Sequence, residues 1–279
     1  MWMINFFKKK ENLKKINQKS QLPDLFPWIA NLEKNYINLC KQDINIRINE
    51  IYDLKKYFKT NKGLNQLLDL KNSLVTNGYP ENAAQLEIDF FLELFEEDTI
   101  KYLLFNNTAG LHLHQDNGNF NKKIKVNKDF GIIRTPIGKV FIVGSGNTLL
   151  PVLTSMFLSY IAGNNTAVQL SSLHVNCVPK FIESIPFDGA KHIHFTNLNR
   201  EKEDDLLLIE ALITNINWNV INIWGGNDSL DYYNNIISKN NHRPRIVNME
   251  PLTGALILQQ DYFESDLDNN IKNFPLLLG

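Results

Sequence analysis

The short turn Gly144-Ser145-Gly146-Asn147 lies between an apolar run and a long apolar segment, and its residue types could support ligand chemistry. Glycines let a ligand approach the backbone, and the helix start that follows favours a bound anion. Leu149 occupies the third glycine position of the Gly-x-Gly-x-x-Gly dinucleotide motif, so the motif is incomplete. Asn147 could cap the following helix, or its side-chain amide could stabilise a developing oxyanion. The pattern alone leaves open both a nucleotide site and an ordinary strand-to-helix turn.

Three further apolar runs end in small or polar residues. These endings are Ser171-Ser172, Thr196-Asn197 and Gly225-Gly226. If the runs are parallel strands of one sheet, all four turns lie at its carboxyl edge, where open α/β sheets bind their ligands. The sequence therefore predicts a ligand cleft built from these turns.

From about residue 130 onward, short apolar runs alternate with segments of helical period. We expect strands at 139–143, 166–170, 191–196, 220–224, 245–248 and 254–258. We expect helices at 148–162, 175–185, 201–216, 228–238 and 264–274. Strands separated by helices of about ten to fifteen residues are typical of βαβ units. This part of the chain is therefore predicted to be a Rossmann-type α/β fold, with a parallel sheet and flanking helices.

The first part of the chain carries apolar residues at three- and four-residue spacing. This spacing predicts helices at 26–37, 44–58, 63–77 and 82–104. The loop-rich segment 106–123 predicts a hairpin or linker. We therefore expect a mainly helical region, 1–129, that packs on a dinucleotide-binding domain, 130–279.

The composition is that of an ordinary globular chain. Of its 279 residues, 43% are hydrophobic and 21% are charged, and the net charge is −1. This balance argues against a nucleic-acid partner, and no apolar stretch reaches the length of a membrane span. Cys40 and Cys177 are too few for a disulfide framework or a zinc site, so we expect a cytoplasmic protein.

Other catalytic arrangements receive little support from the sequence. His112 and His114 could share one side of a strand, as could His192 and His194, but a metal needs a third ligand and none is apparent. No Ser-His-Asp arrangement or phosphate-binding loop of the Gly-Lys-Ser/Thr type is visible. We therefore expect no metal.

The ordered series of motifs resembles the cofactor domain of the aldehyde dehydrogenase superfamily. The series consists of "VGSGNTLLPVLTSMFLSYIAGNNTAVQLSS", "VINIWGGNDSLDYYNNI" and "RIVNMEPLTGALIL". More narrowly, it is similar to the acyl-CoA reductases that make fatty aldehyde for bacterial bioluminescence. The resemblance implies an enzyme that uses NADP, with NAD also possible, to reduce a fatty acyl-CoA or acyl-protein thioester to an aldehyde. It also implies an acyl-protein synthetase as a possible partner, and an oligomer for the full-length family.

The resemblance assigns roles to individual residues. Asn147 takes the oxyanion-hole position, and Gln169 falls where the superfamily usually has a lysine that holds the adenine ribose. Ser172 falls where NAD-preferring members often carry a glutamate, which favours NADP because a carboxylate would repel a 2′-phosphate. The full set of expected cofactor contacts is Val143, Gly144, Ser145, Gly146, Asn147, Gln169, Ser171, Ser172, Thr196, Trp224, Gly225 and Gly226.

The family's nucleophilic cysteine has no counterpart in the sequence. Reduction of a thioester in this family uses a thiolate, and neither Cys40 nor Cys177 aligns with it. The alignment places that cysteine just beyond Gly279, so we expect the catalytic domain to be absent and this chain to be inactive alone. Two alternatives stay open, namely an inactive nucleotide- or partner-binding module and an acyl-phosphate reductase of the same superfamily.

Overall fold

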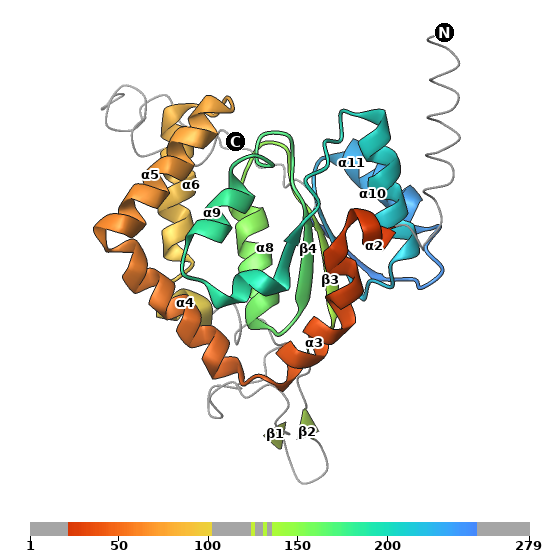
Figure 1. The fold of residues 1–279 in the computed structure, drawn as a ribbon, viewed down its shortest axis with the longest axis horizontal. Helices are drawn as coiled ribbons and strands as arrows, with labels where there is room; N and C mark the ends of the chain where they lie inside the picture. Colours follow the sequence, from red (N-terminus) through yellow and green to blue (C-terminus); the bar gives the residue numbers. More distant parts are fainter. Residues whose placement is uncertain (1–21, 102–123, 126–130, 133–135, 250–279) are drawn as a thin grey trace, which may run out of the picture.

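A parallel five-stranded sheet forms the centre of the protein (Figure 1). The computed structural model describes residues 22–101, 124–125, 131–132 and 136–249. The strands are β3 (Lys139–Val143), β4 (Asn165–Gln169), β5 (Ile193–Phe195), β6 (Val220–Trp224) and β7 (Arg245–Met249). Their spatial order is β5-β4-β3-β6-β7 and every pairing is parallel. This is the third-second-first-fourth-fifth order of a Rossmann-type sheet, so the predicted fold class is confirmed.

The central strand β3 is buried on both faces. Val140 and Ile142 belong to one hydrophobic cluster, whereas Phe141 and Val143 belong to a second cluster. Neighbouring residues of a strand point to opposite faces, so the two clusters are the cores above and below the sheet. A continuous apolar run, rather than alternation with polar residues, is what a strand covered on both faces requires.

Four helices connect the strands and cover both faces (Figure 1). They are α8 (Leu150–Ile161), α9 (Val178–Ser184), α10 (Glu203–Asn215) and α11 (Asn227–Ile237). The first two belong to the cluster of Ile142, and the last two to the cluster of Phe141. Helices α8 and α9 begin later than the sequence pattern suggested, because Pro151 and Pro179 occupy their first turns, where a missing amide hydrogen costs nothing.

The helical region is confirmed, with changed boundaries. Its elements are α2 (Leu22–Leu25), η1 (Pro27–Asn31), α3 (Leu32–Lys41), α4 (Ile44–Phe58), α5 (Asn61–Thr76), α6 (Glu81–Glu93) and α7 (Glu97–Lys101). The expected helix 82–104 ends at Glu93, and the turn that follows buries Phe95 against Phe91 and Phe157. The expected helix 26–37 starts instead as a 3₁₀ turn at Pro27.

An aromatic cluster joins the helical region to the sheet layer. Phe58, Phe91 and Phe95 come from the helical region, and Phe157 and Phe181 come from α8 and α9. Their ring centroids lie 4.9–6.1 Å apart, within the range of favourable aromatic pairs. Helices α4 to α6 therefore form an outer layer over α8 and α9 (Figure 1).

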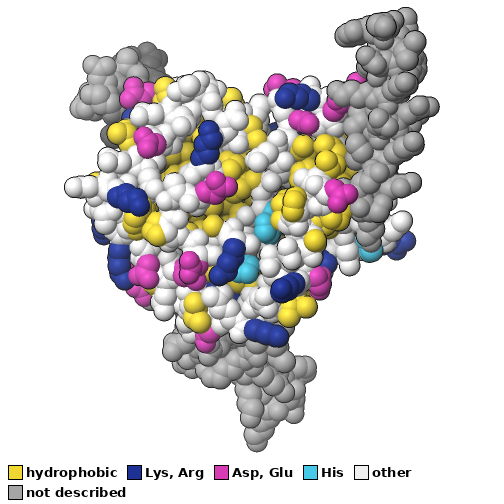
Figure 2. All heavy atoms as spheres, in the orientation of Figure 1, with side chains coloured by type: hydrophobic (Ala, Val, Ile, Leu, Met, Phe, Trp, Pro, Cys, Tyr) yellow, Lys and Arg dark blue, Asp and Glu magenta, His cyan; other side chains and the backbone are white. Residues whose placement is uncertain are grey.

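Several predicted segments lie outside the described residues, namely 106–123, the strand 254–258 and the helix 264–274. Next to the first of these, β1 (Ile124–Lys125) and β2 (Gly131–Ile132) pair antiparallel. In the space-filling view, acidic and basic side chains intermingle on the face shown (Figure 2). None of the described helices is both long enough and apolar enough to cross a membrane.

Candidate functional site

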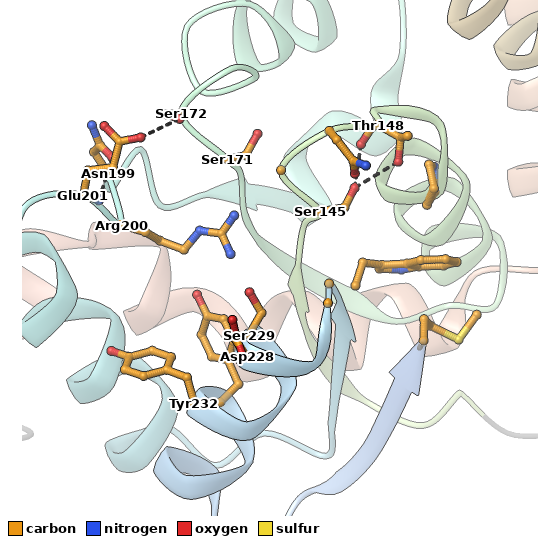
Figure 3. Close-up of a pocket in the computed structure, with 18 of the residues that line it drawn as sticks. Ser145, Thr148, Ser171, Ser172, Asn199, Arg200, Glu201, Asp228, Ser229 and Tyr232 are labelled. Atoms are coloured by element: carbon orange, nitrogen blue, oxygen red, sulfur yellow. Dashed lines mark hydrogen bonds between the residues drawn. The ribbon is translucent and has the colours of Figure 1, made fainter. Parts of the chain in front are cut away.

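A cleft of about 1070 Å³ opens at the carboxyl edge of the sheet (Figure 3). Its walls are the turns that follow β3, β4, β5 and β6, together with the first part of α11. The chain leaves β3 toward β4 on one side and later returns to β6 on the other, so this edge is the topological switch point. The volume suits a ligand of cofactor size.

Eight of the twelve expected contact residues line this cleft. They are Ser145, Gly146, Asn147, Ser171, Ser172, Trp224, Gly225 and Gly226. Segments up to about eighty residues apart along the chain thus meet at one edge, as the parallel arrangement predicted. Cofactor binding by these residues stays a prediction.

Val143, Gly144, Gln169 and Thr196 are buried and do not line the cleft. Gln169 is fully buried, and its side-chain nitrogen donates to the carbonyl oxygens of Leu170 at 2.8 Å and Leu198 at 2.7 Å. Its side-chain oxygen accepts from the Thr196 hydroxyl. The Gln169 amide is thus engaged within the protein, and the arrangement gives no support to the expected ribose contact. The two side chains instead join the ends of β4 and β5.

Gly144 is tightly packed. Its amide donates to the carbonyl oxygen of Gln169 at 2.8 Å. A Cβ atom there would lie 3.0 Å from the Val152 side chain and 3.2 Å from the Gln169 carbonyl oxygen. An added side chain would therefore crowd Val152 of α8, which would have to shift by a few tenths of an ångström.

The turn after β3 also differs from expectation at Asn147. Leu149, not Asn147, is the N-cap residue of α8, so the capping role considered for Asn147 is wrong. The Asn147 side chain is exposed at the cleft. The Ser145 hydroxyl closes the turn by donating to the Thr148 carbonyl oxygen at 2.7 Å. The oxyanion role of Asn147 stays a prediction.

Glu87 supplies the missing cap from the helical region. One of its carboxylate oxygens accepts from the backbone amides of Leu149 at 3.2 Å and Leu150 at 2.6 Å. Burial raises the Glu87 pKa above the ordinary value, while these two hydrogen bonds oppose the rise. The N-terminus of α8 is therefore already occupied by an anion of the protein itself. Local sequence patterns could not reveal this partner, because it lies more than sixty residues earlier.

We expect the Glu87→Ala substitution to lower the free energy of unfolding by about 1 kcal/mol, the usual cost of losing a helix cap. The Glu87→Gln variant keeps an acceptor and avoids the buried charge. Because the folded-state pKa is raised, the fold is more stable with Glu87 protonated than with Glu87 ionised, and this extra stability is lost as pH rises through that pKa. Urea unfolding from acid to neutral pH should thus show a flatter pH dependence for Glu87→Gln than for the wild type. Parallel curves would contradict this.

A buried chain of hydrogen bonds connects the cleft to the helical region. The Ser171 hydroxyl lies 2.9 Å from His174 Nδ1, and the Tyr79 hydroxyl lies 2.6 Å from His174 Nε2. Burial, and secondly the positive charge of Arg200, lower the His174 pKa to about 4. The imidazole is therefore neutral at physiological pH, so one ring nitrogen donates and the other accepts. The chain fixes the position of Ser171.

The carboxylate of Glu201 lies beside Ser172, a position at which the resemblance implies an uncharged side chain. Ser172 donates to Glu201 at 3.3 Å, so an acidic group from the turn after β5 lies beside the Ser172 position. Arg200, from the same turn, also lines the cleft, and both turns are drawn in Figure 3. Ser172 itself carries no charge, but the carboxylate of Glu201 lies beside it.

Neither cysteine lines the cleft. Cys177 is buried, its thiol donates to the His174 carbonyl oxygen at 3.4 Å, and burial raises its pKa. These properties are those of a structural cysteine and not of a nucleophile. Cys40 lies on α3, away from the cleft. Across the described ranges, no group of three or more His, Cys, Asp or Glu side chains could hold a metal ion.

No protein-family model matches the sequence, and no curated protein does. Solved structures do match. An NAD-dependent benzaldehyde dehydrogenase from Corynebacterium glutamicum is 11% identical, with a TM-score of 0.60 over 82% of this chain and 46% of its own. An aldehyde dehydrogenase from Bacillus cereus in complex with NAD+ is 14% identical, with a TM-score of 0.58 over 91% and 47%. The glyceraldehyde-3-phosphate dehydrogenase GapN from Methanocaldococcus jannaschii in complex with NADP is 14% identical, with a TM-score of 0.56 over 82% and 46%.

These matches establish the fold. The fold of this chain is aldehyde-dehydrogenase-like, as the sequence predicted, and the chain spans less than half the length of these relatives.

Proposed function

We propose that this chain is the nicotinamide-dinucleotide-binding part of an oxidoreductase that acts on aldehydes or acyl groups. The observation that carries the proposal is the cleft at the switch point of the sheet, lined by the turns after four parallel strands. The neighbours in fold bind the same class of cofactor, since one is a complex with NAD+ and another a complex with NADP.

The glycines of the cleft fit a dinucleotide. A Cβ atom added at Gly146 or Gly226 would meet no atom within 4 Å, so at both positions the backbone faces open space. Both residues line the cleft. A phosphate group can therefore approach their amides without contact with a side chain.

The N-terminus of α11 is the better site for the pyrophosphate. Gly226 is its N-cap residue and offers no side chain, so no side-chain hydrogen bond satisfies the first amides. The N-terminus of α8, by contrast, is occupied by the carboxylate of Glu87. Since a second anion would be repelled there, we place the pyrophosphate at Gly225 and Gly226.

When bound, the nicotinamide ring would supply or accept a hydride. The exposed side-chain amide of Asn147, at the turn after β3, would donate a hydrogen bond to the oxygen on which negative charge develops. Trp224 lines the cleft next to Gly225, and its ring nitrogen donates to the Ser155 hydroxyl at 2.9 Å, which fixes the indole.

The finer proposal is the reduction of a fatty acyl-CoA or acyl-protein thioester by NADPH. Thioester, NADPH and a proton would give aldehyde, thiol and NADP+. The nucleophilic thiol would have to come from elsewhere than this sequence, because its only two cysteines are Cys177, which is buried, and Cys40, which does not line the cleft. The motif series supports the narrower family, and with it a cytoplasmic location, an acyl-protein synthetase partner and oligomerisation.

A second candidate is a nucleotide-binding module without catalysis, which the lack of a thiol among the described lining residues favours. The test begins with fluorescence titration of the chain with NADPH and NADH. We expect saturable binding, with dissociation constants from about 1 μM to 1 mM. Binding together with aldehyde formation from acyl-CoA would support the acyl-CoA reductase. Aldehyde formation from acyl phosphate alone would support an acyl-phosphate reductase. Binding without turnover by this chain is expected both of the module and of a cofactor-binding part whose thiol comes from elsewhere, and absence of binding would overturn the proposal.

A further inference from the structure

The Ser171 hydroxyl lies beside a neutral histidine at the wall of the cleft. Ser171 follows β4 and is only 2% exposed, yet it lines the cleft, so the cleft is the side from which a ligand can reach it. Its oxygen lies 2.9 Å from His174 Nδ1, which is hydrogen-bond distance. A serine hydroxyl held against an imidazole in this way is the arrangement of an activated nucleophile and its base.

Tyr79 orients the histidine. The imidazole of His174 is completely buried, and the Tyr79 hydroxyl lies 2.6 Å from its Nε2. Nδ1 can take a proton from Ser171 only when the ring hydrogen is on Nε2, where the Tyr79 oxygen accepts it. Burial, and secondly the charge of Glu87, raise the Tyr79 pKa, so this hydroxyl stays neutral. Serine, histidine and a third orienting group are the three parts of an acyl-transfer triad.

Two groups near Ser171 could stabilise negative charge on a substrate oxygen. Within the described residues, the backbone amide of Ser172 donates no hydrogen bond, and the amide directly after a nucleophilic serine is a common oxyanion donor. Arg200 extends its guanidinium into the cleft between Ser171 and Ser229 (Figure 3). Its charge contributes to the lowered pKa of His174, so the guanidinium lies near the serine and histidine pair. Such donors favour acyl transfer because they meet the charge as it develops.

We propose that Ser171 is the nucleophile of an acyl-transfer site in this cleft, that His174 is its base, and that the site hydrolyses carboxylic esters and thioesters. The Ser171 oxygen bonds to the carbonyl carbon while its proton passes to His174 Nδ1. His174 then gives the proton to the leaving alcohol or thiol as the bond to the carbonyl carbon breaks. Water attacks the acyl-serine by the same steps and releases a carboxylic acid. The reaction uses no nicotinamide cofactor, so it goes beyond the proposed function.

The test measures hydrolysis of p-nitrophenyl butyrate by the full chain, together with mass spectrometry after reaction with a fluorophosphonate. The phosphonyl group should be found on Ser171. Ser171→Ala and His174→Gln should each lower kcat/KM by about a hundredfold or more, because they remove the nucleophile and its base. Ser238→Ala removes an exposed hydroxyl at the end of α11, should change nothing, and is the control.

Tyr79 is a positioning residue, since it does not line the cleft. Tyr79→Phe should lower kcat by about tenfold and leave KM unchanged, whereas a purely structural hydroxyl would leave both unchanged in the folded variant.

Three results would overturn the inference. They are the absence of hydrolysis by the wild type, hydrolysis that persists in Ser171→Ala, and a phosphonyl group on another residue. None of them concerns dinucleotide binding, so the proposed function would stand. Circular dichroism checks that each variant is folded. If a variant does not fold, labelling of the wild-type chain decides.

Discussion

The Gly226→Val substitution is expected to lower the affinity for both NADPH and NADH by about a hundredfold or more. The backbone at Gly226 has φ −73° and ψ 171°, an extended conformation that valine adopts readily. Its added Cβ would meet no protein atom within 4 Å, so the fold has room for the side chain. The space that the side chain fills is the space in front of the first amides of α11. Losing the hydrogen bonds from these amides to the pyrophosphate costs about 3 kcal/mol.

Graded variants and thermal unfolding test this explanation. Gly226→Ala adds a single methyl group and should weaken binding much less than Gly226→Val does. Both variants should unfold within a few degrees of the wild type, because neither strains the backbone. Unchanged binding of either dinucleotide to Gly226→Val would show that the pyrophosphate does not lie at α11. The Gly146→Val variant, which adds a side chain at the other open glycine, would then locate it.

The layers of this fold could be predicted because their signals are local. The run from Val140 to Val143 is apolar throughout, which predicts a strand buried on both faces, and it became the central strand. The small residues after each strand predicted the edge at which the cleft lies. Parallel strands bring these turns to one edge regardless of where individual side chains point. The topology alone therefore accounts for the eight of twelve residues that line the cleft.

Side-chain direction and distant partners could not be predicted in the same way. Gln169 was expected to face a ribose, but the turn of the chain at Leu198 offers its amide a buried carbonyl instead. Glu87, on α6, and Tyr79, in the turn before it, contact the site from a part of the chain far away in sequence, and no periodicity relates them to α8 or to His174. Contacts of this kind depend on how α6 packs against α8, which only the folded chain reveals.

The turn after β5 lies at the predicted edge, but its cleft residues differ from the predicted ones. The sequence pattern singled out Thr196 and Asn197, the first residues after the predicted strand. Asn197 has a φ of 53°, a left-handed conformation that asparagine tolerates better than most residues. Farther along this turn, Arg200 and Glu201, rather than Thr196, line the cleft.

The Arg47→Met substitution is expected to lower the free energy of unfolding by about 3 kcal/mol, since each buried carbonyl oxygen left without a partner costs about 1–3 kcal/mol and removal of the buried charge offsets part of this. Arg47 lies on α4 and is only 1% exposed. Its guanidinium donates to the carbonyl oxygens of Ile161 at 2.8 Å, Leu39 at 3.1 Å and Gln42 at 2.7 Å. Ile161 is the last residue of α8, and Leu39 and Gln42 lie at the end of α3. One side chain thus satisfies carbonyl groups at the ends of two helices.

Methionine has a similar length but donates no hydrogen bond, so Arg47→Met leaves these three carbonyl oxygens without their partner. Urea unfolding measures the loss, and Lys56→Met on the same helix is the control. Lys56 pairs with Asp53 on the surface, where an exposed ion pair contributes about 0.5 kcal/mol or less. Because Arg47 does not line the cleft, the fraction of Arg47→Met that remains folded should bind NADPH as the wild type does. An unfolding midpoint equal to that of the control would mean that α4 is held to α8 by its apolar contacts alone.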